Sequence, residues 1–506
     1  MTARAIMVQG TASSVGKSIV VAAMCRLFRQ EGLRVAPFKS QNMALNAFVT
    51  PDGGEIGRAQ AVQAEAACVT PTVDMNPILL KPEGDARSQV VVLGKPIGSL
   101  GAMEYHARKR ELRAIVSASL ERLRAAYDVV VIEGAGSPAE VNLKDRDIVN
   151  MFVAGIADCK VVLVGDIDRG GVFAAFVGTL ELLEPDERAR IGAFLINKFR
   201  GDVRLLESGL RFLEERTGVP VLGVLPYLQR LRVADEDSLS LDERRGRRRA
   251  GKTEVEVAVV RLPRIANYDD FQPLEQEPGL VVRFVDQPDD LAGADLVVLP
   301  GTKSTIADLR WLRETRIADA VILRARRGEP VLGVCGGCQM LGEHVADPER
   351  VESDDALADG LALLPVTTHF SREKRTSQVR ARPIAPSFLS DGGDIEVTGY
   401  EIHMGRVERS KRAPGAFAIH ARNGVPDDDV DGAVSPGRVV VGTMMHGLFE
   451  NACVRQALLG FLRARKGLAR LELPQAPAAP PDPFDRLADT LRSHVDVSQL
   501  WRLLGP

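Results

Sequence analysis

The sequence lacks the features of a membrane protein, of a disulfide framework and of a nucleic-acid-binding chain. None of its apolar runs approaches the roughly 20 residues that a membrane helix needs. Its six cysteines are scattered along 506 residues, unlike the dense pattern of a disulfide-stabilised fold. The formal net charge of −3 gives no reason to expect a nucleic-acid or membrane partner. These absences predict a cytoplasmic globular protein.

The length and the hydropathy pattern predict an α/β protein with more than one domain. A chain of 506 residues is too long for one ordinary core. Short β-rich runs alternate with helical patterns, which predicts parallel sheets with crossover helices. We expect a first domain over residues 1–235, a charged linker over 236–252, a second domain over 253–450, and C-terminal helices with a proline-rich spacer over 451–506.

The stretch GTASSVGKS, from Gly10 to Ser18, predicts a phosphate-binding loop of unusual length. It follows an apolar run at 5–8 and precedes a helical pattern, so its amides lie at a helix N-terminus, where an anion is favoured. Five residues separate Gly10 from Gly16, one more than in the common loop. We expect Lys17 to reach the phosphates of a nucleotide and Ser18 to ligate Mg²⁺.

Residues at other strand ends support this nucleotide site. Glu133 closes the run YDVVVIE and supplies a carboxylate where Mg²⁺ beside a phosphate loop needs an oxygen ligand. The stretch VGDIDRGG at 164–171 is either a phosphate or substrate contact or a glycine turn. The stretched loop resembles that of dethiobiotin synthetase and its relatives, which use ATP to activate carboxylates. This resemblance implies that Lys39, which follows another predicted strand, screens the phosphoryl charge.

The stretch VLGVCGGCQMLG predicts a nucleophilic cysteine on a sharp turn between a strand and a helix. The G-x-nucleophile-x-G pattern around Cys335 needs glycine because larger residues clash in such a turn. The start of a helix lowers the pKa of a thiol there, and the backbone N–H of Gly336 can hold an oxyanion. The loop at Gly301–Thr302 follows another strand and is the candidate to complete the oxyanion hole. The alternative is a redox pair with Cys338.

A nucleophilic cysteine needs a base, for which His446 is the first candidate and His403 the second. The strand-to-helix turn at Cys335, called the elbow below, and His446 together resemble a class I glutamine amidotransferase domain. This resemblance implies that a thiolate attacks the glutamine amide, that a thioester forms and that ammonia is released. That class has a carboxylate two residues after the histidine, whereas this chain has Leu448 there and Glu450 four residues on. Either another group orients the imidazole, or Cys335 and His446 act as a dyad.

Eight stretches, in chain order, extend the resemblance over most of the sequence. They are SQNMALNAFVTPDGGEIGRAQAVQAEAA, MNPILLKP, GAGSPAEVNLKDRDIVNMFVA, LVGDIDRGGVFA, LINKFRGD, PGTKSTIADLRWLR, GYEIHMG and GTMMHGLFEN. Together they resemble the cobyric acid synthase family of the cobalamin pathway, and differ from the related cobyrinate a,c-diamide synthases in the stretch after Lys39.

The family resemblance implies a reaction that the residues alone do not specify. ATP, Mg²⁺ and L-glutamine would serve to amidate the b, d, e and g propionates of adenosylcobyrinic acid a,c-diamide through carboxyl phosphates. One alternative is another ATP-dependent amidotransferase, such as a cobyrinate a,c-diamide synthase. An alternative of a different class is a P-loop ATPase switch whose second domain binds a partner.

Overall fold

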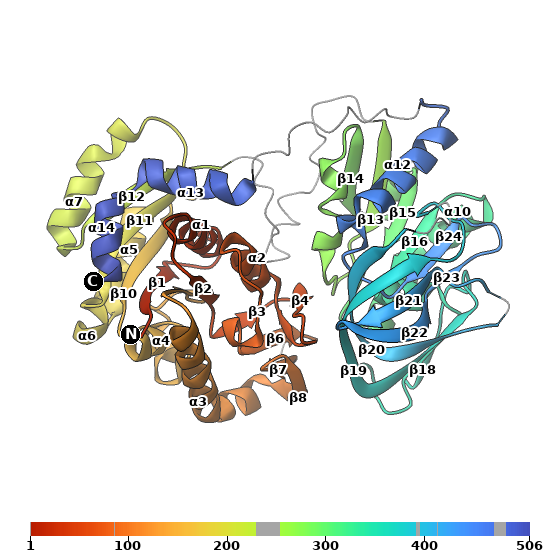
Figure 1. Cartoon of the computed structure of the whole chain (residues 1–506), viewed down its shortest axis with the longest axis horizontal. Helices are drawn as coiled ribbons and strands as arrows, with labels where there is room; N and C mark the ends of the chain where they lie inside the picture. Colours follow the sequence, from red (N-terminus) through yellow and green to blue (C-terminus); the bar gives the residue numbers. More distant parts are fainter. Residues whose placement is uncertain are drawn as a thin grey trace.

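The protein folds as two α/β domains that lie side by side (Figure 1). The computed structural model describes residues 2–84, 87–228, 254–390, 395–411, 413–469 and 482–505. The predicted linker at 236–252 lies outside these ranges, as does most of the predicted proline-rich spacer.

The first domain is built on a six-stranded sheet in which every neighbouring pair of strands is parallel. In spatial order the strands are β12 (Val221–Pro226), β11 (Ile191–Phe199), β10 (Lys160–Asp166), β1 (Arg4–Gly10), β9 (Val129–Glu133) and β2 (Val35–Phe38). Strand β1 lies where the strand order reverses, and in such sheets ligands bind at the carboxyl ends beside this point. The predicted parallel sheet is confirmed.

Helices cover both faces of this sheet, which explains why its strands are continuous apolar runs. The helices are α1 (Lys17–Gln30), α2 (Arg58–Ala66), α3 (Ala102–Ala126), α4 (Met151–Ala157), α5 (Val172–Leu182), α6 (Pro185–Arg188) and α7 (Glu207–Thr217). Along β1 the side chains alternate between faces: Ile6 and Val8 pack in the core that contains α1, whereas Ala5 and Met7 pack with α3, α4 and α5.

Short strands between β2 and β9 form a part of the first domain that the sequence analysis did not predict. They are β3 (Gln41–Met43), β4 (Ala47–Val49), β5 (Glu55–Gly57), β6 (Ile78–Pro82), β7 (Arg87–Val92) and β8 (Lys95–Gly101). Strands β4 and β5 form a hairpin, and β3, β6, β7 and β8 form a four-stranded sheet. In Figure 1 they lie on the side of the first domain that faces the second domain.

The second domain has its own six-stranded sheet, parallel except at one edge. Its spatial order is β14 (Leu280–Val285), β13 (Val255–Val260), β15 (Leu296–Leu299), β16 (Val331–Val334), β24 (Val440–Thr443) and β23 (Ala433–Val434). Its helices are α9 (Thr305–Glu314), α10 (Ile317–Arg326), α11 (Gly336–Leu341) and α12 (Ala452–Arg465). No helix among the described residues is long and apolar enough to cross a membrane.

A mixed sheet, antiparallel except for the pair β17–β19, packs beside this parallel sheet. It contains β17 (His344–Ala346), β18 (Leu357–Asp359), β19 (Val366–Pro383), β20 (Val397–Arg409), β21 (Phe417–Arg422) and β22 (Val425–Asp431). The sequence analysis did not predict this sheet. Helix α11 ends at Leu341, and His344 begins β17, where its side chain is 51% exposed.

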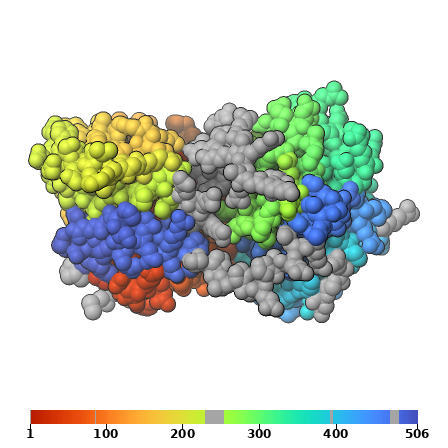
Figure 2. Space-filling model, turned by 90° about the horizontal axis from the view of Figure 1, so that it is seen from above, coloured from red at the N-terminus to blue at the C-terminus, as the bar shows by residue number. Residues whose placement is uncertain are grey.

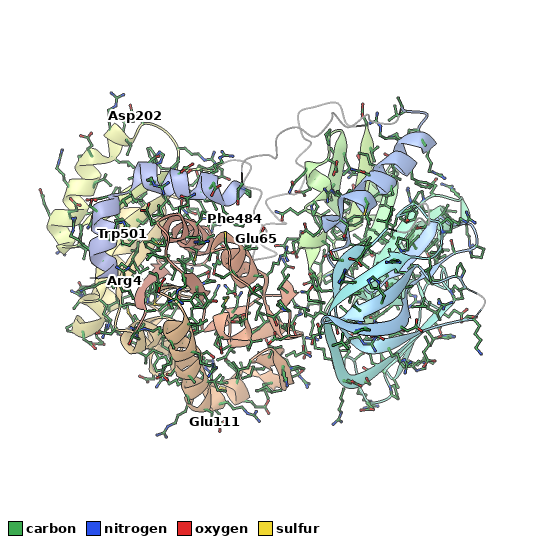
Figure 3. All side chains as sticks on the ribbon, in the orientation of Figure 1. Arg4, Glu65, Glu111, Asp202, Phe484 and Trp501 are labelled. Atoms are coloured by element: carbon green, nitrogen blue, oxygen red, sulfur yellow. The ribbon has the colours of Figure 1, made fainter. Side chains whose placement is uncertain are left out.

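The C-terminal helices α13 (Pro483–His494) and α14 (Val497–Leu504) return to the first domain (Figure 2). Phe484, Leu487 and Leu491 recur at helical spacing and are buried in the core that contains α1. On α14, the ring of Trp501 lies 5.9 Å from the guanidinium carbon of Arg4 at the start of β1 (Figure 3). The two ends of the chain are therefore joined in one core.

One face of β19 joins the two domains. Its side chains point alternately to either face of the strand, and Lys374 and Thr376 both reach the β4–β5 hairpin region. The hydroxyl of Thr376 donates to the carbonyl of Gly53 at 2.7 Å, and Lys374 pairs with Glu55. Glu55 is fully buried and also pairs with Lys81 at 2.8 Å. Burial alone would raise the pKa of Glu55, but the two lysines hold it at about 2.

We expect Glu55→Gln to destabilise the docked protein by about 3–5 kcal/mol, because it leaves two buried lysines without their carboxylate. Urea denaturation followed by tryptophan fluorescence measures this loss. The control is Glu83→Gln, which removes the partner of Lys303 at the same domain interface, where both side chains keep some exposure (11% and 18%). A loss for Glu55→Gln no greater than for Glu83→Gln would contradict the role given to this cluster.

Candidate active site

Cys335 occupies a sharp turn between β16 and α11, with a backbone φ of 51° and ψ of −111°. This region favours glycine, so the turn is strained at a side chain that is itself 5% exposed. The neighbouring glycines have no room for a side chain. A Cβ on Gly337 would lie 1.9 Å from the carbonyl oxygen of Leu299, and one on Gly336 would lie 2.7 Å from the methyl group of Thr302.

His446 follows the neighbouring strand β24, so the parallel sheet brings it to the elbow. Its Nδ1 lies 2.6 Å from a carboxylate oxygen of Asp270, and its ring stacks on Tyr400 with centroids 5.4 Å apart. The Cys335 thiol, which donates to the carbonyl of Ile402 at 4.0 Å, also interacts with this imidazole. Burial alone would lower the pKa of His446, but the charges of Asp270 and Cys335 raise it to about 10.

Asp270 is the carboxylate that orients the imidazole, and the sequence analysis did not find it. It lies in a 3₁₀ turn, η4 (Tyr268–Phe271), after β13, and its second oxygen accepts from the N–H of Gly447 at 2.8 Å. Glu450, which the sequence offered instead, is 59% exposed and lies 3.6 Å from Arg58. Two acids in a loop after a strand were the available signal, but Asp270 lies 176 residues before His446, and that separation hid the contact.

The predicted oxyanion-hole glycines lie beside the Cys335–His446 pair. A Cβ on Gly301 would be 2.8 Å from Cε1 of His446, and Gly336 faces the backbone N–H of Thr302. The second candidate base, His403, lies on β20, where its Nδ1 contacts the carbonyl of Gly405 at 3.0 Å. Of these two histidines, His446 is the one whose ring contacts a carboxylate, that of Asp270.

Cys338 packs in the core of the second domain, fully buried on α11. A Cβ on Gly442 of β24 would lie 2.6 Å from its sulfur, and burial raises the pKa of its thiol well above the usual range. Both Cys335 and Cys338 are free thiols. This packing favours a structural role for Cys338 over a redox pair.

A cavity at Cys335 is walled by both domains. The first domain contributes Lys81 and Gln89, which are paired neighbours on β6 and β7. The second domain contributes the remaining lining: Ala266, Asn267, Thr302, Lys303, Thr305, Cys335, Gln339, Glu352, Phe370, Lys374, Ile402, His403, Met404 and His446. The cavity at Cys335 is therefore shared by the two domains.

The phosphate loop joins β1 to α1 and is held by residues from β11. Gly16 has a φ of 98°, and a Cβ there would lie 2.2 Å from Nδ2 of Asn197. That amide donates to the carbonyl of Val15 at 2.9 Å, and the ammonium of Lys198 donates to the carbonyl of Ser14 at 2.7 Å. The sequence analysis quoted Asn197 and Lys198 only within a family motif, and their contact with the loop arises from the sheet.

Gly10 and Lys17 lie at the two ends of the loop. A Cβ on Gly10 would lie 2.6 Å from the side chain of Val15. The loop therefore folds back so that Val15 packs directly against Gly10. The ammonium of Lys17 donates to the carbonyls of Ala12 at 3.0 Å and Gly136 at 3.2 Å. Gly136 belongs to the loop after β9, so Lys17 bridges two loops at the same edge of the sheet.

Glu133, at the carboxyl end of β9, contacts two other residues of the predicted nucleotide site, Ser18 and Lys39. Its side chain is fully buried, and one of its oxygens lies 2.9 Å from both the hydroxyl of Ser18 and the ammonium of Lys39. The other oxygen accepts from the amide of Gln63 on α2, a contact that the sequence analysis missed. The structure thus brings Ser18, Lys39 and Glu133 together as the sequence predicted.

This combination defines a class of protein. A nucleotide-binding α/β domain with a stretched phosphate loop is docked against an α/β domain in which a cysteine elbow, a histidine and a buried aspartate meet. Those are the parts of an enzyme that couples a nucleotide site to a glutamine amidotransferase centre.

Comparison with known proteins agrees with this class. Residues 6–241 match the CobQ/CobB/MinD/ParA nucleotide binding domain, and residues 256–454 match the CobB/CobQ-like glutamine amidotransferase domain. The chain is 62% identical to cobyric acid synthase of Sorangium cellulosum, covering 100% of this chain and 99% of that protein. It is 51% identical to that of Dehalococcoides mccartyi (99% of both chains) and 50% identical to that of Klebsiella pneumoniae (99% and 98%). The chain belongs to the cobyric acid synthase family, and it is a glutamine-hydrolysing amide ligase.

We expect the His446–Asp270 pair to stabilise the fold most strongly below about pH 6.5, where both the folded and the unfolded imidazole are protonated. Because the folded pKa is raised, this stabilisation falls as the pH rises towards about 10. The free energy of unfolding of wild type minus that of His446→Gln, measured in urea across this range, should shrink accordingly. His344→Gln is the control, because its pair with Asp359 is exposed and contributes little. A wild-type advantage that grows with pH would contradict the assignment.

Proposed function

We propose that Cys335, His446 and Asp270 form the glutaminase centre. His446, whose pKa is raised, holds the thiol proton as an imidazolium beside the Cys335 thiolate, and the thiolate attacks the carboxamide carbon of glutamine. Asp270 accepts from the Nδ1–H of His446 and so fixes the tautomer and stabilises the imidazolium. The imidazolium then gives its proton to the departing nitrogen, and the C–N bond breaks to leave a thioester and ammonia. Water hydrolyses the thioester to glutamate.

The oxyanion formed in these steps needs donors next to the reacting carbon. The N–H of Gly336 follows the nucleophile directly, and the loop at Gly301 lies against His446. Backbone amides held in this way stabilise the tetrahedral intermediate more than the substrate carbonyl, which is the origin of their effect on rate.

The first domain is proposed to transfer the γ-phosphoryl group of ATP to a propionate of the corrinoid substrate. A free carboxylate is a poor acyl donor, and a carboxyl phosphate has a good leaving group. Loop amides from Gly10 to Gly16 cradle the phosphates, and Lys17 and Lys39 neutralise charge on them. These assignments are supported by the position of all four residues at one edge of the parallel sheet.

Ser18 and Glu133 would hold Mg²⁺ in this site. A hydroxyl and a buried carboxylate 2.9 Å apart are the oxygen ligands that this ion accepts beside nucleotide phosphates. Within the described ranges, no group of three histidine, cysteine or acidic side chains is placed to hold a metal ion. The other ligands would therefore be phosphate oxygens and water, which is common for Mg²⁺. The ion supplies charge neutralisation for phosphoryl transfer.

Ammonia is proposed to pass between the two centres without entering bulk water, where it would be protonated to ammonium. The wall that Lys81 and Gln89 contribute to the Cys335 cavity supports this route. Ammonia then displaces phosphate from the acyl phosphate, so that one C–O bond is exchanged for the C–N bond of the amide.

The substrate follows from the family. We propose adenosylcobyrinic acid a,c-diamide as the acceptor, with amidation of its b, d, e and g propionates to give adenosylcobyric acid. The observation that carries the reaction type is the buried Cys335–His446–Asp270 arrangement in the same chain as the Ser18–Glu133 site.

Cys335→Ala should abolish glutamine hydrolysis, and Asp270→Asn should lower its kcat by about 10²- to 10⁴-fold, because the amide no longer fixes the tautomer of His446. A coupled glutamate assay measures both. Glu450→Gln is the matched control and should hydrolyse glutamine at the wild-type rate. Hydrolysis by Cys335→Ala at the wild-type rate would remove the proposed nucleophile.

Glu133→Gln should lose amide synthesis but keep basal glutamine hydrolysis, because only the nucleotide site is changed. Mass spectrometry after incubation with ATP, Mg²⁺, glutamine and the diamide reads out synthesis. In wild type it should show four successive conversions of a carboxylic acid to an amide. Amidation restricted to the a and c groups of cobyrinic acid would favour the cobyrinate a,c-diamide synthase reaction instead.

A further inference from the structure

Arg58, the first residue of α2 in the first domain, is buried against the turn that carries Asp270 of the second domain. Its Nε lies 2.9 Å from a carboxylate oxygen of Asp269, and the two side chains are 17% and 4% exposed. Helix α2 lies at the side of the first domain that faces the second, where Figure 3 labels Glu65 of the same helix. Arg58 of the nucleotide-binding domain is thus paired with Asp269, the residue that precedes Asp270.

The charge of Arg58 is needed where it lies. Asp269 and Asp270 are consecutive and both buried, with 6% of each residue exposed. Burial raises the pKa of Asp269 to about 6 even though Arg58 opposes this rise, and the nearby carboxylate of Asp270 adds to it. Without the guanidinium, a second buried carboxylate would stand uncompensated beside the one that holds His446.

The turn η4 is held from the first domain at two points. Asn267, the residue before it, has a φ of 51°, and its side-chain oxygen accepts from the N–H of Ala47 on β4 at 2.9 Å. Asp269 inside the turn is held by Arg58, whose guanidinium carbon lies 5.5 Å from the ring centre of Phe48. Because both anchors belong to the first domain, the geometry of Asp270 depends on domain docking.

We propose that Arg58 is a positioning residue for glutamine hydrolysis, contributed to the glutaminase centre by the nucleotide-binding domain. By fixing Asp269, it holds the adjacent Asp270 in place against His446. This inference rests on the proposed function of Cys335, His446 and Asp270. The glutaminase centre is then complete only when the two domains are docked. Ammonia is therefore released only beside the nucleotide-binding domain, which activates the acceptor carboxylate.

Arg58 has a second carboxylate neighbour that does not carry this role. Glu450 lies 3.6 Å from the guanidinium and is 59% exposed. Exposed ion pairs contribute little, because water screens the charges. Glu450→Gln therefore removes a partner of Arg58 without touching the buried pair, which makes it the matched control.

The test compares steady-state glutamine hydrolysis in Arg58→Met, Arg58→Lys, Asp269→Asn and Glu450→Gln. Arg58→Met should lower kcat by about 10²-fold, the loss expected when a catalytic group shifts by an ångström, with the KM for glutamine near the wild-type value. Arg58→Lys should restore part of the rate, and Glu450→Gln should match wild type. Amide synthesis from an ammonium salt should persist in Arg58→Met, since the nucleotide site is unchanged.

A double-mutant cycle connects the effect to Asp269. If Arg58 acts through that carboxylate, Arg58→Met combined with Asp269→Asn should be no slower than Arg58→Met alone. Full additivity of the two losses would overturn the proposal, as would a wild-type kcat in Arg58→Met or a raised KM with kcat kept. Should Arg58→Met fail to fold, Asp269→Asn alone decides, because it keeps the volume and must lower kcat.

Two further variants separate this inference from the proposed function. If Cys335→Ala and Asp270→Asn hydrolyse glutamine like wild type, the proposed function itself fails. If both lose hydrolysis while Arg58→Met keeps it, the glutaminase centre stands and only the role of Arg58 is wrong.

Discussion

Parallel strands end at the same edge of a sheet, and both reactive centres of this protein depend on that constraint. In the first domain, the loop after β1 and the carboxyl-terminal parts of β9 and β11 bring Lys17, Glu133 and Asn197 to the same edge. In the second domain, the loops after β13, β15, β16 and β24 converge on Cys335 and His446. No local sequence motif contains either set, because a sheet edge collects residues that the crossover helices keep far apart along the chain.

Docking of the two sheets adds a second level of organisation. The long strand β19 and the buried Glu55–Lys81–Lys374 cluster fix the first domain against the cavity at Cys335. Helix α2 contacts residues at both centres. Its first residue, Arg58, contacts Asp269 in the turn that contains Asp270, and the side-chain amide of Gln63 donates to Glu133. The cavity at Cys335 is thereby lined by side chains of both domains.

The features that could be predicted from the sequence are those whose physical cause is local. The loop from Gly10 to Ser18 must combine a strand end, glycine-dependent backbone and a helix start within a few residues, and the same holds for the elbow at Cys335. The apolar strands of both six-stranded sheets were readable because both faces of each sheet are buried, by helices in the first domain and by helices and the mixed sheet in the second. The mixed sheet around β19 was missed, because β19 alternates polar and apolar residues and its pairing depends on distant partners.

The sequence by itself therefore determined the two α/β domains with parallel sheets, and it predicted the phosphate loop, the proposed nucleophile and its histidine. Only the tertiary structure decided that Asp270 orients that histidine, that Asn197 holds the phosphate loop and that Arg58 reaches across the domain boundary. Each of these contacts joins residues on different strands or domains. Their distances are set by sheet order and domain docking, so the spacing of residues along the chain contains no measure of them.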